Sequence, residues 1–227
     1  MAKLKFGAVI SDARGSIEGV TFSQGRFGAF ARKRAVPRLQ TTAFNTVVRG
    51  RLANFARRWF GTLTAVQRTA WIDLAIANPV IDVFGNSHAL TGQQLYIRVN
   101  QLRAQAGLAV LDAAPADQAV TGLVTMSVVA TAPATLTLTF TVTPLSAGHR
   151  LYIFASPSLS PGKVATRADM KFIGVSAAAQ ASTYAAGTQY TTRFGNMIST
   201  KLISVSVAVL RDDRGALSPY FFASDPA

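Results

Sequence analysis

The stretch from Thr41 to Ala77, TTAFNTVVRGRLANFARRWFGTLTAVQRTAWIDLAIA, predicts two consecutive helices that organise the first half of the chain. Five apolar residues in it are spaced four, four, three and four apart, which places them on one face of a helix. They are Phe44, Val48, Leu52, Phe55 and Trp59. Gly61 follows as a typical helix stop.

The second helix of this stretch begins at a capping box. Thr64 and Gln67 have the Thr-x-x-Gln spacing in which the two side chains satisfy each other's backbone N–H groups. The apolar positions that follow are Val66, Ala70, Trp71 and Leu74. We expect the helix to end at Asn78, because a residue before proline disfavours helical dihedral angles. About three residues would separate the helices, which predicts an antiparallel αα-hairpin.

The two tryptophans, Trp59 and Trp71, lie on the apolar faces of these helices. This placement favours packing in the core over the alternative, stacking on nucleic acid bases.

A third helix is predicted by a second capping box, formed by Thr91 and Gln94. Its apolar positions are Leu95, Val99, Leu102 and Ala106, and Gly107 is its expected stop.

The first 36 residues predict short strands separated by glycine-containing turns. The strands are expected at Leu4–Ile10, Ile17–Phe22 and Ala29–Arg34, with turns at Ser11–Gly15 and Gln24–Gly28. Three short strands are marginal by themselves. Two alternatives follow: they pack on the helices of their own chain, or they pair with an edge strand of another subunit.

The second half of the chain changes from a helical period to a period of two. Residues 108–122 have no clear period and predict a linker. Strands are then expected at Leu136–Val142, Leu151–Phe154, Lys171–Val175, Gln189–Thr192, Leu202–Leu210 and Tyr220–Phe222. About seven short strands without a helix between them favour an antiparallel sandwich of the immunoglobulin or fibronectin type III architecture.

The predicted fold class is therefore α+β with two domains: short N-terminal strands with a three-helix unit, then an all-β sandwich. The predicted divisions are an N-terminal basic β-hairpin arm at 1–36, a helical docking domain at 37–107, the linker at 108–122 and the sandwich at 123–227.

Composition argues against several classes of function. The 227-residue chain has no cysteine, so it has no disulfide, no thiolate nucleophile and no cysteine-based zinc site. We expect no signal peptide and no membrane span. His88 and His149 stand alone, and the adjacent pair Asp212–Asp213 is explained by a hairpin turn next to Gly215. The sequence therefore predicts no catalytic, metal or cofactor site, and no enzyme.

The positive charge of the chain is concentrated in its first half. The net charge is +13, and residues 1–107 hold 15 basic against 4 acidic residues while residues 108–227 hold 8 against 6. This asymmetry predicts contact with an acidic partner: nucleic acid, an anionic membrane or an acidic protein surface. The alternative is a solvated helix face. The predicted partner-binding residues are Arg26, Arg32, Lys33, Arg34, Arg38, Arg49, Arg51, Arg57, Arg58 and Arg68.

Residues 1–107 resemble the N-terminal region of small virion-associated proteins encoded by tailed bacteriophages and prophages. The matching pieces are the Ser11–Ser23 hairpin, the basic run before Pro37, the Trp59–Trp71 segment with its Leu-Thr-x-x-Gln-Arg-x-x-Trp pattern, Phe84-Gly85-Asn86 and Leu90–Tyr96 with Asn100. The resemblance implies a structural role in the virion and supplies no catalytic residues.

From the charge and the resemblance together we expect a capsid decoration or cement protein, made in the host cytoplasm and located in the virion. Its partner would be the major capsid protein or another virion protein, and it would form a homo-oligomer within the assembly, without membrane contact. Two alternatives remain: a nucleic-acid-binding protein associated with genome packaging, although no zinc-finger, RNP or basic-zipper pattern is present, and a neck or tail component near the portal.

Overall fold

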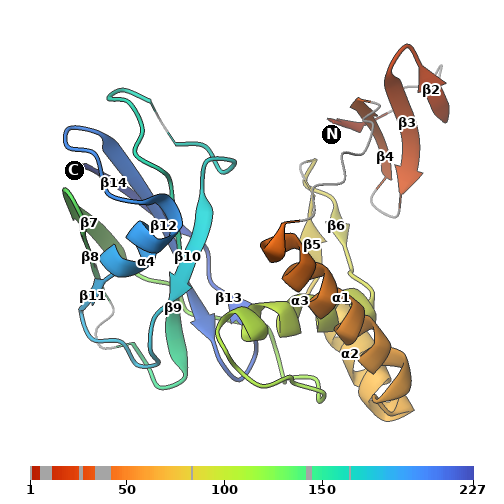
Figure 1. Cartoon of the computed structure of the whole chain (residues 1–227). Coiled ribbons are helices and arrows are strands. Elements are labelled where there is room, and N and C mark those ends of the chain that lie inside the picture. The colour runs from red at the N-terminus through yellow and green to blue at the C-terminus, as the bar shows by residue number, and fades with distance from the viewer. Residues whose placement is uncertain are drawn as a thin grey trace. The chain divides into compact units, whose positions relative to one another are not determined.

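The computed structural model describes residues 2–5, 12–25, 28–33, 42–82, 84–141, 145–163 and 165–227. It is a mixture of helices and antiparallel sheets, as expected for an α+β protein (Figure 1). The chain divides into two compact units, Met1–Leu95 and Tyr96–Ala227. The division falls inside helix α3 (Gly92–Gln105), rather than at the predicted end of the helical domain, Gly107.

The first unit begins with a four-stranded antiparallel sheet in the order β1-β4-β3-β2. Its strands are β1 (Ala2–Leu4), β2 (Gly15–Ile17), β3 (Val20–Gly25) and β4 (Gly28–Lys33). The chain's own β1 pairs with β4, with Lys3 opposite Phe30. The predicted strand from Leu4 to Ile10 therefore lies earlier, at residues 2–4, and its remainder falls mostly outside the described residues.

Helices α1 (Ala43–Gly61) and α2 (Ala65–Ala77) occupy the predicted positions, and α2 runs back from the end of α1 (Figure 1). The Thr64 capping box is present, with the Thr64 N–H donating to Gln67 Oε1 at 2.9 Å. A two-stranded ribbon, β5 (Val80–Ile81) with β6 (Ser87–His88), follows. The second capping box opens α3, with Gln94 N donating to Thr91 Oγ1 at 3.1 Å.

Only some of the predicted apolar residues of α1 and α2 are buried by other described parts of the chain. Phe55, Trp59 and Trp71 are buried, as predicted. Leu52 and Val66, which were expected on the same faces, are 52% and 79% exposed, so this part of the prediction is wrong. Each residue turns a helix by about 100°, so Leu52 lies about 60° around the axis from Phe55. The described elements cover the side that carries Phe55 and Trp59 and leave the neighbouring side open.

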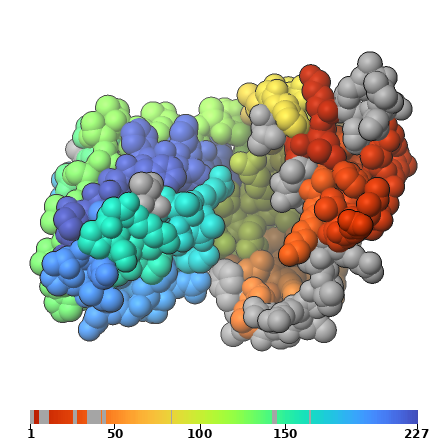
Figure 2. Space-filling view, turned by 90° about the horizontal axis from the view of Figure 1, so that it is seen from above, coloured from red at the N-terminus to blue at the C-terminus, as the bar shows by residue number. Residues whose placement is uncertain are grey.

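The second unit contains two antiparallel sheets that share one hydrophobic core. One sheet has the order β10-β9-β12-β13, and β14 also pairs with β12; the other has the order β11-β8-β7. Their bounds are β7 (Thr125–Thr131), β8 (Thr135–Thr141), β9 (His149–Ala155), β10 (Lys171–Val175), β11 (Thr183–Ala185), β12 (Leu202–Arg211), β13 (Ala216–Leu217) and β14 (Phe221–Pro226). In the space-filling view, the cyan and blue segments of this unit lie side by side (Figure 2).

A short helix, α4 (Gly187–Phe194), replaces the strand predicted at Gln189–Thr192. Tyr190 and Phe194, four residues apart, come together on one helix face with ring centroids 5.1 Å apart, and Tyr190 is fully buried. Gly187 is required at the start, because a Cβ there would lie 2.0 Å from the carbonyl oxygen of Ala134. Packing against the β7–β8 turn thus overrides the strand preference of Tyr-Thr-Thr.

The predicted linker, residues 108–122, has no helix or strand, but it is tied to the second unit. The Asn100 amide accepts the N–H of Leu111 at 2.7 Å and donates to the Leu111 carbonyl at 3.1 Å. The Tyr96 hydroxyl donates to Asp112 at 3.1 Å. These hydrogen bonds attach Leu111 and Asp112 to α3 within the second unit. A flexible tether would not need such bonds.

Candidate surface for an acidic partner

The described members of the predicted cationic set lie on three elements of the first unit. Arg32 and Lys33 are exposed at the end of β4, and Arg68 is half-buried on α2. Helix α1 carries Arg49, Arg51, Arg57 and Arg58. Arg26, Arg34 and Arg38 lie outside the described residues.

The arginines of α1 are spread around the helix rather than along one line: Arg49 and Arg57 are exposed, and Arg51 and Arg58 are half-buried. Arg51 and Arg58 are seven residues apart and share one side, whereas Arg49 lies about 160° around the axis from Arg51. Among the described residues, Arg49, Arg51 and Arg57 make no hydrogen bond or ion pair, and the same holds for Arg68 on α2. Their charges are therefore not balanced within the described part of the chain.

Exposed apolar side chains lie beside these arginines. On α1, Leu52 and the 69% exposed Phe60 are on the side that carries Arg49. On α2, Arg68, Ile72 and Ile76 follow one another at four-residue spacing, and both isoleucines are exposed. We call these six residues the cationic–apolar surface. The sequence indicated its charge but not its apolar half: Leu52 was expected to be buried, and Phe60, Ile72 and Ile76 belonged to neither predicted apolar face.

A buried carboxylate ties the N-terminal sheet to the β5–β6 ribbon. Asp82 accepts hydrogen bonds from Lys3 Nζ at 2.8 Å and from the N–H groups of Phe84 and Asn86 at 2.8 and 3.0 Å. Its other neighbour is His88 Nε2 at 3.4 Å. The hydrogen bond from Lys3, reinforced by the two backbone donors, lowers the pKa of Asp82 well below its usual range, although burial opposes the shift. The N-terminal sheet thus contacts the β5–β6 ribbon of its own chain, a contact that neither of the two sequence alternatives included.

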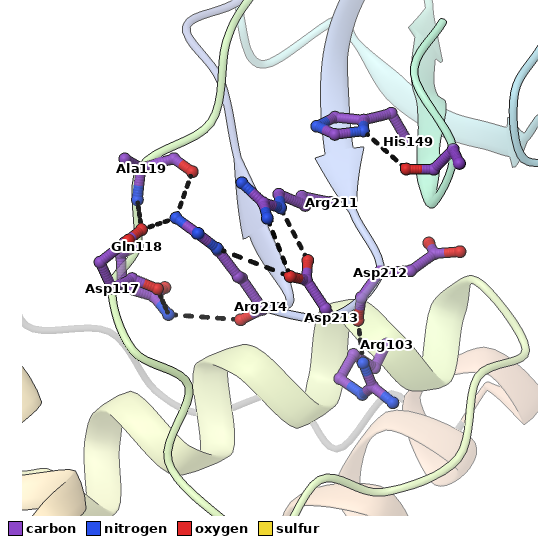
Figure 3. A network of polar contacts seen from close by, with 10 residues as sticks. Arg103, Asp117, Gln118, Ala119, His149, Arg211, Asp212, Asp213 and Arg214 are labelled. Carbon is purple, nitrogen blue, oxygen red and sulfur yellow. Dashed lines mark hydrogen bonds and ion pairs between the residues drawn. The ribbon is translucent and has the colours of Figure 1, made fainter.

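The adjacent carboxylates Asp212 and Asp213 lie in the turn between β12 and β13 (Figure 3). Asp212 pairs with Arg150 at 2.9 Å, and Asp213 pairs with Arg211 at 2.8 Å. The same turn binds the segment before β7, because Arg214 pairs with Asp117. Each carboxylate therefore faces a guanidinium, an arrangement that stabilises a turn and leaves no carboxyl group poised to donate or accept a proton.

The turn also holds α3 in the second unit. Arg103 donates to the Asp212 carbonyl. Gly215 has φ +58°, and a Cβ there would lie 2.6 Å from Val99 Cγ1. This close approach needs a glycine, both for its backbone conformation and for its lack of a side chain.

His149, in the same region, has Nδ1 3.1 Å from the Ala147 carbonyl oxygen (Figure 3). Within the part of the chain that the structure describes, no three side chains of the His, Cys, Asp or Glu type are grouped so that they could hold a metal ion. No helix built from the described residues has the length and apolar character needed to cross a membrane.

No family model matches the chain, and no curated protein matches it.

Proposed function

We propose that the protein is a structural component of a tailed-bacteriophage virion, and specifically a capsid decoration or cement protein that docks through its first unit. The observation that carries this proposal is the cationic–apolar surface, where arginines without an acidic partner stand beside exposed leucine, isoleucine and phenylalanine side chains. Its partner would be an acidic lattice of major capsid protein, on which several copies would bind as a homo-oligomer.

The composition of this surface supports a protein partner. Aromatic residues and arginine are enriched at protein interfaces, and they supply most of the residues whose truncation weakens binding. Phe60 would enter an apolar pocket of the lattice, and the neighbouring arginines would form bidentate contacts with carboxylates around it. The charges would set orientation and association rate, whereas apolar burial would supply the affinity.

The second unit would be the outward-facing module. The strand order supports a fibronectin type III-like sandwich rather than a constant-type immunoglobulin domain. With the two-residue β13 set aside, β10 is the fourth strand of this unit, and it pairs with β9 in the sheet that contains β12. In a constant-type domain the fourth strand would instead lie in the sheet of the first, second and fifth strands, which here are β7, β8 and β11.

The test is co-sedimentation of the full-length protein with particles that lack it, at increasing salt. We expect the Arg49→Gln/Arg68→Gln double variant to bind more weakly than the native protein, and the loss to shrink at high salt, because exposed charges are screened. Lys171→Gln together with Lys201→Gln, in the second unit, is the matched control for charge and should bind normally. Equal binding by the double variant and the control would refute the proposal.

A nucleic-acid-binding role in genome packaging is the second candidate, and the unpaired arginines of α1 are the observation that favours it. Affinity for DNA would then fall linearly with the logarithm of salt concentration, with a slope that counts phosphate contacts. A gel-shift experiment without a complex at low salt would eliminate it. A neck or tail position near the portal would share the docking surface and would be distinguished by the number of copies per particle.

A further inference from the structure

The outward face of β12 carries small residues at its centre. Ile203, Val205 and their alternate neighbours enter the core, so Ser204, Ser206 and Ala208 point to the opposite face of the sheet. In the register of the sheet, Ser206 lies between Phe154 of β9 and Phe222 of β14. A small residue between two aromatic residues leaves a notch in the surface of the sheet.

This notch is a cavity of about 180 Å³, lined by Phe154, Arg167, Met170, Ser206, Tyr220 and Phe222. An apolar cavity of about 150 Å³ is sufficient for a benzene ring, so the volume suits a single six-membered ring. Two edge-on aromatic contacts fix one wall, because the ring centroid of Phe154 is 5.9 Å from those of both Phe172 and Tyr220. The wall is therefore preorganised.

The floor of the cavity has a hydroxyl without a partner. Ser206 is only 3% exposed, yet its Oγ makes no hydrogen bond with any described residue. Ser176 and Ser218, which follow β10 and β13, instead accept the N–H groups of Leu151 and Val209, each at 2.9 Å. The Ser206 hydroxyl is therefore free to form a hydrogen bond with a ligand in the cavity.

The rim of the cavity carries a cation. The Arg167 guanidinium carbon lies 6.0 Å from the centroid of the Tyr220 ring, which holds the side chain beside the cavity. Arg167 makes no ion pair among the described residues. The nearest acidic residue in sequence, Asp169, is engaged by Thr166 at 2.8 Å and by Lys163 at 3.7 Å. The guanidinium therefore remains available to an anion.

We propose that this cavity is a binding site for a carboxylate that carries one aromatic ring. The ring would occupy the space between Phe154 and Phe222, and the carboxylate would accept hydrogen bonds from Arg167 and from the Ser206 hydroxyl. Such a ligand is either a free aromatic acid or the C-terminal aromatic residue of a peptide. The site lies within the second unit and does not depend on the proposed virion role.

The test is ligand-observed NMR of the full-length protein with benzoate and phenylacetate as free acids, N-acetyl-glycyl-phenylalanine as the peptide end, and benzyl alcohol as the neutral ring. We expect millimolar or tighter binding of at least one carboxylate and at least tenfold weaker binding of benzyl alcohol, because a charged hydrogen bond is lost. Preference between the free acids and the peptide identifies the source of the ligand. Benzyl alcohol binding as well as the carboxylates, or no binding of any carboxylate, would overturn the proposal.

Variants locate the site. Arg167→Gln should weaken binding of the carboxylate about tenfold, and Ser206→Val, which fills the notch, should abolish it. Lys201→Gln removes a positive charge elsewhere in the same unit and should leave binding unchanged. Unaltered thermal unfolding of each variant would show that the fold is retained. Binding that survives Ser206→Val in a folded protein would overturn the assignment.

Discussion

The two units of the chain differ in how completely they bury their own apolar residues. In the second unit, two sheets and α4 enclose a continuous core that includes Leu151, Tyr190 and Ile203, all inaccessible to solvent. In the first unit, α1 and α2 bury one side and leave Phe60, Ile72 and Ile76 exposed beside the unpaired Arg49 and Arg68. A partner that buried these exposed apolar side chains would gain binding free energy from their removal from water. The comparison therefore supports the proposal that docking uses the first unit, because more of its apolar surface is left exposed.

The largest effect is expected from the core of the second unit. Ile203→Ala should lower the free energy of unfolding by about 2–5 kcal/mol, because it deletes a fully buried side chain and leaves a cavity. Ile198→Ala is the matched control, and since Ile198 is 56% exposed its cost should stay within about 0.5 kcal/mol. All five tyrosines lie in this unit and both tryptophans in the first, so near-ultraviolet circular dichroism can follow its unfolding. Equal losses in the two variants would contradict the description of the core.

A smaller effect is expected at the turn that holds α3. Gly215→Ala should cost about 2–3 kcal/mol, because it adds a positive-φ penalty to a collision with Val99. Gly195→Ala supplies the control, since Gly195 also has a positive φ, +82°, but has open space around its Cβ position. Its cost should be about 1 kcal/mol. Denaturant unfolding measures both, and a cost at Gly215 no greater than that at Gly195 would show that the close approach is not important.

In the first unit, the capping box of α2 is expected to contribute about 1 kcal/mol. Thr64→Ala removes the acceptor of the Gln67 N–H and should lower the unfolding free energy by that amount, followed by tryptophan fluorescence. Thr69→Ala, at an exposed position inside the same helix, should be neutral or slightly stabilising, because alanine has the higher helix propensity. A neutral Thr64→Ala would indicate that the helix start does not limit the stability of this unit.

The smallest effect concerns the link between Asp82 and Lys3. The pKa of Asp82 is lowered in the folded protein, so the carboxylate contributes stability above the pKa of an unfolded aspartate, about 4, and the contribution is lost as pH falls below that value. The native protein should therefore lose more stability between pH 5 and pH 3 than Asp82→Asn does. Identical pH profiles of tryptophan-detected unfolding would contradict this assignment.

Local signals in the sequence predicted much of the fold. Thr64 and Thr91 marked two helix starts, and the alternating stretch at 202–210 marked the central strand β12. These features are encoded within a few residues. Helix α4 was missed because Gly187 and Tyr190 adopt it through contacts with distant segments, which no local pattern records.

The candidate sites were predictable only in part. The basic composition identified the arginines, but not that Leu52 would remain exposed beside Arg49, because a helical period predicts an apolar face but not which residues cover it. The cavity at Ser206 had a signal in the sequence, a row of small residues on one face of β12. Its aromatic walls come from β9 and β14, whose register the sequence alone did not provide.

The most direct test of the contrast between the units is hydroxyl-radical footprinting of the full-length protein, free and bound to particles. The account predicts that binding protects Leu52, Phe60 and Ile76 from labelling, whereas Ile198 and Phe222 of the second unit remain as reactive as in the free protein. Protection of Ile198 and Phe222 with unchanged labelling of Phe60 would contradict it, because docking would then occur through the sandwich.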